Sequence, residues 1–133
     1  MITADEETLV YTRRFNGNSG NNEDFFYSFK AADSDIWDTA KDLGNPINSE
    51  SNEGAICISP DGKRLFFASN RGQYDGNSFD IYYCYKSGDN WHGPVNIGEP
   101  VNSSAWDSQP SISADGKALY FCSRRKGGYG GID

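Results

Sequence analysis

The chain has 133 residues and a formal net charge of −7, and its one run of three basic residues is Arg124-Arg125-Lys126. Because phosphate binding needs a clustered basic surface, this balance argues against a nucleic-acid partner. No apolar run approaches the roughly 20 residues that a membrane helix needs, which argues against direct membrane insertion.

The opening of the chain is the loosest of three copies of one segment. Residues 2–12 match residues 58–69, which recur closely at 112–123. The aligned aspartates are 56 and 54 residues apart, at Asp5, Asp61 and Asp115. A fixed period of this size marks a repeat architecture. Met1 aligns with Cys57, so we expect the chain to begin inside a strand.

The first repeat, residues 1–52, is then predicted to continue with a strand over 24–30 and an outer strand that starts at Ile36-Trp37, which match Asn90-Trp91. Its first turn carries Asp5-Glu6-Glu7 where the other copies have Asp-Gly-Lys. This departure favours a type I turn there, without a positive φ.

The second repeat, residues 53–106, is the most complete. It predicts strands over 53–59, 64–70, 80–86 and 91–97, with turns at 60–63 and 87–90 and a polar loop over 71–79. The inner strands are apolar on successive residues, which indicates that both faces are covered. The third repeat, residues 107–133, matches only the front half of this unit.

Four short antiparallel strands in about 50 residues are typical of one β-propeller blade. The predicted fold is therefore all-β, with about two and a half four-stranded blades of a larger propeller. A β-sandwich with a duplicated segment is the alternative, but it calls for a cleaner alternation of apolar and polar residues. Expressed alone, such a segment is expected to be unstable, to self-associate or to need completion by other material.

The run 58–69, followed by Asn70-Arg71 and Asp80-Ile81-Tyr82, resembles the WD40-like propeller repeats of the TolB type. Residues 127–133 look like the same segment in Bacteroidetes-type envelope proteins, which pair the propeller with an OmpA-like peptidoglycan-binding domain. The resemblance implies a periplasmic, outer-membrane-associated scaffold of the envelope or of a type IX secretion apparatus, with a protein partner.

Candidate chemical groups are few, and we expect no catalytic residue, metal or cofactor. His92 is read as an edge-strand residue, and the three repeated aspartates as turn caps. Each of Cys57, Cys84 and Cys122 falls in a predicted strand and is interpreted as a small buried hydrophobic residue. The sequence does not decide whether any of them forms a disulfide. Residues 74–80 contain several possible calcium ligands, but they lack the full ligand spacing of a calcium-binding loop, so no calcium site is predicted there.

Acidic and basic residues recur around the long loops. Glu53 and Asp107 begin inner strands, where they either bond to the backbone of the next blade's linker or hold a cation at the central channel. Ion pairs are predicted between Arg71 and Asp80, and between Arg125 and Asp133.

The predicted function is a non-enzymatic protein-interaction scaffold, with carbohydrate or peptidoglycan-fragment binding as the alternative. A third hypothesis makes the chain part of a propeller that gates a hydrolase domain. Arginine and aromatic residues dominate interfaces, so the predicted binding residues are Arg71, Tyr74, Trp106, Arg125 and Tyr129.

Overall fold

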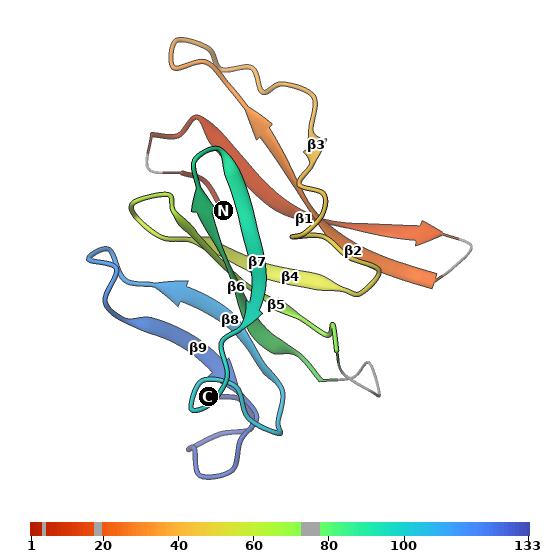
Figure 1. Cartoon of the computed structure of the whole chain (residues 1–133), viewed down its shortest axis with the longest axis vertical. Coiled ribbons are helices and arrows are strands. Elements are labelled where there is room, and N and C mark those ends of the chain that lie inside the picture. Colours follow the sequence, from red (N-terminus) through yellow and green to blue (C-terminus); the bar gives the residue numbers. More distant parts are fainter. Residues whose placement is uncertain (4, 18–19, 73–77) are drawn as a thin grey trace.

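The computed structural model describes residues 1–3, 5–17, 20–72 and 78–133, which form strands, turns and loops and no helix (Figure 1). The all-β prediction is confirmed. In chain order the strands are β1 (Thr8–Gly17), β2 (Gly20–Phe29), β3 (Lys41–Asp42), β4 (Glu53–Ile58), β5 (Arg64–Ser69), β6 (Asp80–Ser87), β7 (Asn90–Asn96), β8 (Asp107–Ile112) and β9 (Leu119–Ser123). Within the described residues there is no helix of the length and apolarity that crossing a membrane requires.

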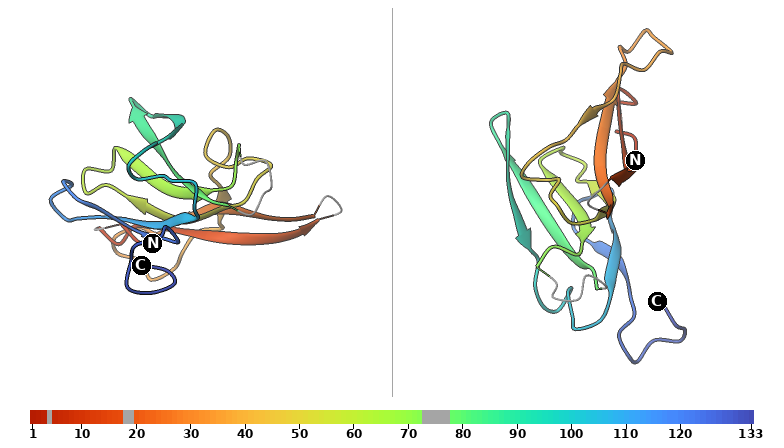
Figure 2. Two further views of the ribbon diagram at one scale, coloured as in Figure 1. Left: turned by 90° about the horizontal axis from the view of Figure 1, so that it is seen from below. Right: turned by 90° about the vertical axis from the view of Figure 1, so that its right-hand side faces the viewer.

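The strands form three antiparallel sheets with the orders β1-β2-β3, β4-β5-β6-β7 and β8-β9. Each strand pairs with its neighbour in sequence, as hairpin connections allow. In Figure 1 the β4–β7 sheet lies between the other two, and Figure 2 shows the β1–β2 hairpin extending beyond the rest of the molecule.

The repeat in the sequence is also a repeat in strand register. An isolated bridge joins Ile2 to Leu9, and the same pairing recurs as Ile58↔Leu65 and Ile112↔Leu119. All three pairs flank the turn that carries the repeated aspartate. Ile2 therefore takes the register position that Ile58 and Ile112 take in the other two copies.

Both complete inner strands contain a β-bulge at the same place. In β4 the pairs Gly54↔Ala68 and Cys57↔Phe66 leave two residues opposite one, and β8 has the same shift between Ser108 and Ser111. The first bulged residues, Ala55 and Gln109, have φ values of 55° and 57°. A non-glycine residue in the left-handed region costs roughly 1–3 kcal/mol, so surrounding contacts hold both in place.

The main core lies between the first and second sheets. Phe25 of β2 meets Phe67 of β5 edge to face, with 5.6 Å between ring centroids, and both are fully buried. The buried members of this cluster are Val10, Phe25, Ile47, Leu65, Phe67, Tyr82 and Cys84. One sheet thus covers the face that its neighbour cannot bury by itself, as stacked blades require.

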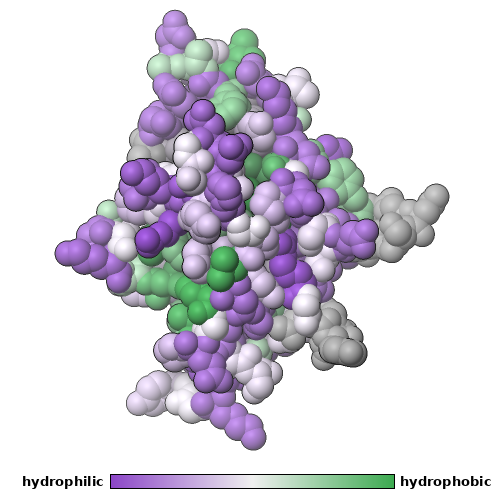
Figure 3. All heavy atoms as spheres, viewed as in Figure 1, coloured by the Kyte–Doolittle hydropathy of each residue, from purple (hydrophilic) through white to green (hydrophobic). Residues whose placement is uncertain are grey.

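A second apolar area remains open. Phe66, Tyr83, Tyr85 and Ile97 contribute to a hollow of about 470 Å³ on the other face of the β4–β7 sheet. Figure 3 shows a hydrophobic area between β6 and the β8–β9 sheet on an otherwise mostly hydrophilic face.

Two local predictions are wrong. The outer strand of the first repeat pairs only at Lys41–Asp42, because the connection before it, residues 30–40, is much longer than the two-residue turn between β6 and β7 and does not fix the register. Trp37 still lies against Lys30, whose Nζ is 5.4 Å from the ring centroid.

The first turn is the other error. Glu6 has a φ of 60°, close to the 69° of Gly62 and the 70° of Gly116 in the same turn of the other repeats. The turn needs its left-handed residue whatever side chain occupies the position, because its hydrogen bonds are the same in all three copies. Glu6 N donates to Thr3 O at 2.9 Å, as Gly62 N does to Ser59 O at 2.8 Å.

Candidate functional site

A buried ion pair ties the start of β4 to the end of β5. Glu53 has no exposed surface, and its Oε1 lies 2.9 Å from Nη2 of Arg71. Ser69 Oγ also donates to this oxygen at 3.0 Å, and the backbone N–H of Ser49 donates to Oε2 at 3.2 Å. We call Glu53, Ser69 and Arg71 the first clasp. Glu53 bonds to a linker backbone, as predicted, but the linker is the one that precedes β4 and not that of the next blade.

Arg71 also binds the linker before its own sheet. Its guanidinium donates to Pro46 O at 3.2 Å and to Ile47 O, and it lies over the Phe67 ring at 5.1 Å. The side chain is only 15% exposed. Because its hydrogen-bond donors serve the linker and the clasp, Arg71 fixes the chain directly after the end of β5.

The second clasp repeats the first with Asp107, Ser123 and Arg125. Asp107 Oδ1 lies 2.9 Å from Arg125 Nη2, and the guanidinium donates to Pro100 O at 2.9 Å and to Val101 O. Burial alone would raise the pKa of Asp107, but hydrogen bonds from Ser123, Arg125 and Ser103 outweigh it and lower the pKa. The carboxylate is therefore held in its charged form.

The predicted ion pairs Arg71–Asp80 and Arg125–Asp133 are wrong, since none of the ion pairs among the described residues joins them. Ser69 pairs with Glu53 on one side and with Asp80 on the other, so both acids lie at one register level. The arginine takes the acid of the inner strand, whereas Asp80 Oδ2 accepts a hydrogen bond from Asn96 at 2.9 Å.

A buried asparagine fixes each linker to the sheet before it. Asn102 accepts from Ile81 N and donates to Ile81 O, both at 2.8 Å, and so replaces a strand partner. Asn48 does the same to Phe25 at 2.9 Å. Sequence reasoning aligned these residues without assigning them a role, although their recurrence directly after Pro46-Ile47 and Pro100-Val101 was a usable signal.

The repeated aspartates cap turns, as predicted. Asp61 Oδ1 accepts from Ser59 Oγ at 2.5 Å and from Lys63 N at 3.1 Å. Asp5 and Asp115 make equivalent bonds. The side-chain hydrogen bond from the Ser or Thr is the largest cause that lowers the pKa of each aspartate.

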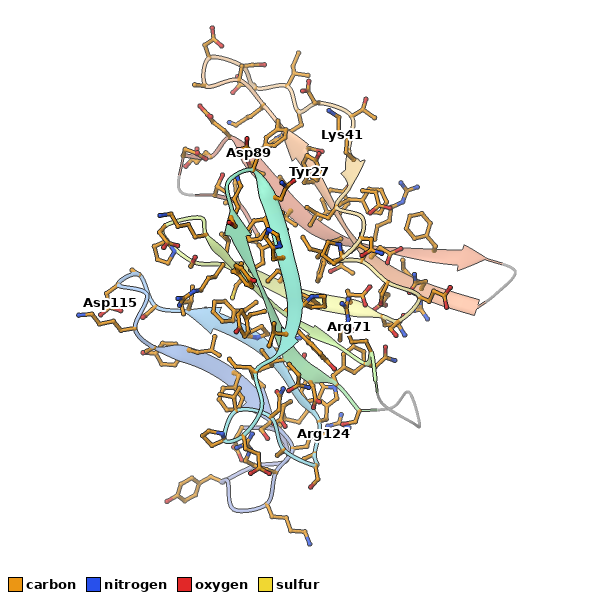
Figure 4. All side chains as sticks on the ribbon, viewed as in Figure 1. Tyr27, Lys41, Arg71, Asp89, Asp115 and Arg124 are labelled. Carbon is orange, nitrogen blue, oxygen red and sulfur yellow. The ribbon has the colours of Figure 1, made fainter. Side chains whose placement is uncertain are left out.

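The strand directions divide the loops between two ends of the molecule. The inner strands begin at one end, where the clasps, the linkers and the loops after β5 and β9 lie. We call this end, formed by the described residues 70–72, 78–79, 98–106 and 124–133, the linker-side rim. The turns of the repeated aspartates and the β6–β7 turn with Asp89 lie at the opposite end, as the labels Asp89 and Arg124 show in Figure 4.

Two hollows lie where segments from all three sheets meet. The larger one, about 860 Å³, is at the turn end and is lined by Ile2, Ile58 and Ile112 among others. The smaller one, about 170 Å³, is at the linker-side rim. We call it the axial pocket, and the residues that line it are Glu23, Gly54, Ala55, Ala68, Phe79, Trp106, Ser108 and Gln109.

Four of the five predicted binding residues belong to the linker-side rim, but their environments differ. Trp106 lines the axial pocket and carries the guanidinium of Arg124 at 5.3 Å from its ring centroid. Tyr129 is fully exposed. Tyr74, and most of the candidate calcium loop at residues 74–80, lie outside the described residues. Arg71 and Arg125 are engaged in the clasps.

The remaining candidate groups are in ordinary surroundings. His92 is an exposed edge residue whose ring stacks on Tyr85 at 5.5 Å. All three cysteines are free thiols; Cys84 is fully buried, and Cys57 and Cys122 are partly buried. Burial raises the pKa of the Cys84 thiol to about 11, and it also raises the pKa of Cys57. Among the described residues no cluster of His, Cys, Asp or Glu is arranged to hold a metal ion.

Comparison with solved structures decides the fold. The crystal structure of TolB from Acinetobacter baumannii superimposes with a TM-score of 0.57 over 96% of this chain, at 20% sequence identity. The chain has a TolB-like β-propeller fold. It covers 26% of the TolB chain, so the predicted propeller segment is confirmed, and the likeness at this identity concerns the fold alone.

No protein-family model matches the chain. Among curated proteins, Dipeptidyl-peptidase 5 of Porphyromonas endodontalis is 33% identical over 92 residues, which are 63% of this chain. The chain spans only 12% of the length of that protein. Similarity to so small a part of a peptidase does not carry the peptidase activity to this chain.

Proposed function

We propose that the chain is part of a non-enzymatic protein-interaction module of the bacterial envelope. The observation that carries this proposal is the pair of clasps, which hold two long loops on one end of a TolB-like propeller segment. Loops held by a rigid scaffold are where binding residues concentrate. The resemblance of the repeats to envelope propellers supports a periplasmic, outer-membrane-associated location, next to an OmpA-like domain or within a type IX secretion apparatus.

The linker-side rim is the proposed contact surface. Arg71 and Arg125 position its loops, and the contacts come from aromatic residues such as Trp106, Tyr129 and Tyr74. Tyrosine and tryptophan bring a large contact area with few rotatable bonds, which makes them frequent interface anchors. This division of roles predicts that the arginines affect both stability and binding, whereas the tyrosines affect binding alone.

Site-directed photocrosslinking tests the proposed surface. A photoreactive phenylalanine analogue at position 129 should crosslink the chain to one envelope protein, identified by mass spectrometry. The same analogue at Asp89, an exposed turn residue at the opposite end, is the matched control. Equal crosslinking at both positions, or none at position 129 in intact cells, would contradict the proposal.

A second candidate function rests on the curated relative. Its name, Dipeptidyl-peptidase 5, is that of a peptidase, so the chain is alternatively part of a propeller that controls access to a peptidase domain. Hydrolysis of dipeptidyl chromogenic substrates by the parent protein, lost when that separate domain is deleted, would favour this function over the scaffold.

A further inference from the structure

The axial pocket is a hollow of the linker-side rim to which all three sheets contribute. Glu23 comes from β2, Gly54 and Ala55 from β4, and Ser108 and Gln109 from β8. Trp106 adds an aromatic wall from the linker before β8. The stacking of the sheets therefore creates the pocket, and no single repeat contains it.

The chemistry of the pocket favours a cation. Glu23 is the only charged residue among the described lining residues, and its side chain is 39% exposed. Its partner Arg14 is 60% exposed and lies 4.0 Å away, so the pairing is loose. A carboxylate beside the ring of Trp106 is a combination that binds ammonium and guanidinium groups, through charge and through the cation–π attraction.

One face of the indole already holds such a group. Arg124 lies over Trp106 at 5.3 Å in the third repeat, where the second repeat has Asn70 beside Asn52. The Trp106 and Arg124 pair therefore replaces an amide pair at one repeat position. Arg124 thus covers part of the Trp106 ring, and Trp106 also lines the axial pocket.

The strained backbone lies at the same place. Ala55 and Gln109 occupy equivalent positions, both with positive φ, and both line the axial pocket. Strain of this kind persists only where the surrounding structure enforces it, and it is concentrated at ligand sites. Here the two bulges shape the floor of one small hollow.

The size of the pocket limits its occupant. Sites for drug-sized ligands are roughly 300–1,000 Å³, and this pocket has about 170 Å³. An oligosaccharide does not fit such a volume, whereas one extended side chain does. The net charge of −7 also favours the approach of a basic protein over an acidic one.

We propose that the axial pocket receives one lysine or arginine side chain of the protein partner, with Glu23 as its counter-ion and Trp106 as its aromatic wall. This inference rests on the proposed protein-interaction function and names the chemistry of the contact. It makes Glu23, which the sequence did not single out, the central recognition residue.

The test is a titration of the parent protein, ¹⁵N-labelled at tryptophan, with the peptide acetyl-Gly-Lys-Gly-amide, followed at the indole N–H resonance of Trp106. That resonance is assigned by the Trp106→Phe variant. The norleucine peptide, which keeps the length and lacks the charge, is the ligand control. We expect a saturable shift with lysine that the norleucine peptide does not cause and that weakens with added salt.

Glu23→Gln should weaken lysine binding about fivefold, the upper value for one exposed charge pair. Asp89→Asn makes the same charge change at the opposite end and should leave binding unchanged. Equal affinity of the wild type and Glu23→Gln, an equal shift with norleucine, or no shift at millimolar peptide would overturn the proposal. A Trp106 shift with chitotriose instead of the peptide would assign the pocket to saccharides.

This experiment separates the two proposals. If the lysine peptide fails while position 129 still crosslinks to a partner, only the pocket assignment is wrong. If the peptide binds and no crosslinked partner appears, the pocket stands and the proposed contact surface is wrong.

Discussion

Replacing Asp42 by asparagine should stabilise the protein near neutral pH. In the second repeat Asn96 accepts hydrogen bonds from Gly98 N and Asn102 Nδ2 and donates to Asp80 Oδ2 at 2.9 Å. Asp42 occupies the same position in the first repeat. It accepts from Gly44 N at 2.6 Å and from Asn48 Nδ2 at 2.5 Å, but a carboxylate has no proton to give to the matching Asp24.

The charge of Asp42 is one of the causes that raise the pKa of Asp24. Burial, the charge of Glu53 and then the charge of Asp42 raise its pKa above the model-peptide value of 3.8. Because the pKa of Asp24 is higher in the folded than in the unfolded state, protonated Asp24 favours folding at low pH. This contribution to the free energy of unfolding is lost as the pH rises through the folded-state pKa. At pH 7 Asp24 is ionised, and the folded state bears the full cost of its charge.

A hydrogen bond to a charged group contributes about 1.5–3 kcal/mol. Asp42 is exposed, so solvent screening reduces the contribution of a hydrogen bond from this position to Asp24. The loss of the negative charge at position 42 also weakens the hydrogen bonds from Gly44 and Asn48. We expect a net gain of about 1 kcal/mol in the free energy of unfolding at pH 7, and less at pH 4, where a larger fraction of Asp24 is protonated.

Urea denaturation followed by tryptophan fluorescence measures the gain at both pH values. It is run at one low protein concentration, since the open sheet faces favour association. With a urea slope near 2 kcal/mol per molar, the midpoint should rise by about 0.5 M at pH 7. The mirror variant Asn96→Asp should lower it. A lower midpoint for Asp42→Asn at pH 7, or the same increment at both pH values, would refute the reasoning.

Three further predictions concern other parts of the chain. Glu6→Gly should raise the free energy of unfolding by about 0.5 kcal/mol, because glycine accepts the positive φ without strain but adds entropy to the unfolded state. Gly62→Ala should lower the free energy of unfolding. Thermal melts that rank the two variants the other way would contradict the turn assignment. Arg71→Ala should lower the free energy of unfolding, measured by urea denaturation, by about 3 kcal/mol, because it leaves the buried charge of Glu53 unpaired. A loss as small as that caused by Arg14→Ala would contradict a stabilising role of the first clasp. Cys84, whose pKa is about 11, should be the last thiol alkylated by iodoacetamide at pH 8 in peptide mapping, after Cys57 and Cys122; early labelling would show that β6 opens easily.

The period in the sequence was sufficient for the fold class and for the register of the inner strands. Turn chemistry is local, so the aspartate caps could be assigned from a few neighbouring residues. The error at Glu6 shows the limit of that reasoning. Glycine was taken as the requirement of the turn, although the backbone hydrogen bonds impose the positive φ and glutamate accepts it at a cost.

The partner of Arg71 could not be read from spacing. Glu53 and Asp80 flank Ser69 at the same register level, so the sequence offers two equivalent acids. Which one binds the guanidinium depends on the packing of the linker, whose carbonyl oxygens at Pro46 and Ile47 hold the arginine on the side of Glu53.

The sequence by itself determined what depends on neighbours along the chain, namely the repeats, the short strands and the turns between them. Only the tertiary structure decided what depends on the stacking of sheets. The axial pocket brings Glu23, Ala55 and Gln109 together across more than 80 residues of chain, and no pattern within one repeat reveals that contact, because each sheet supplies only part of the wall.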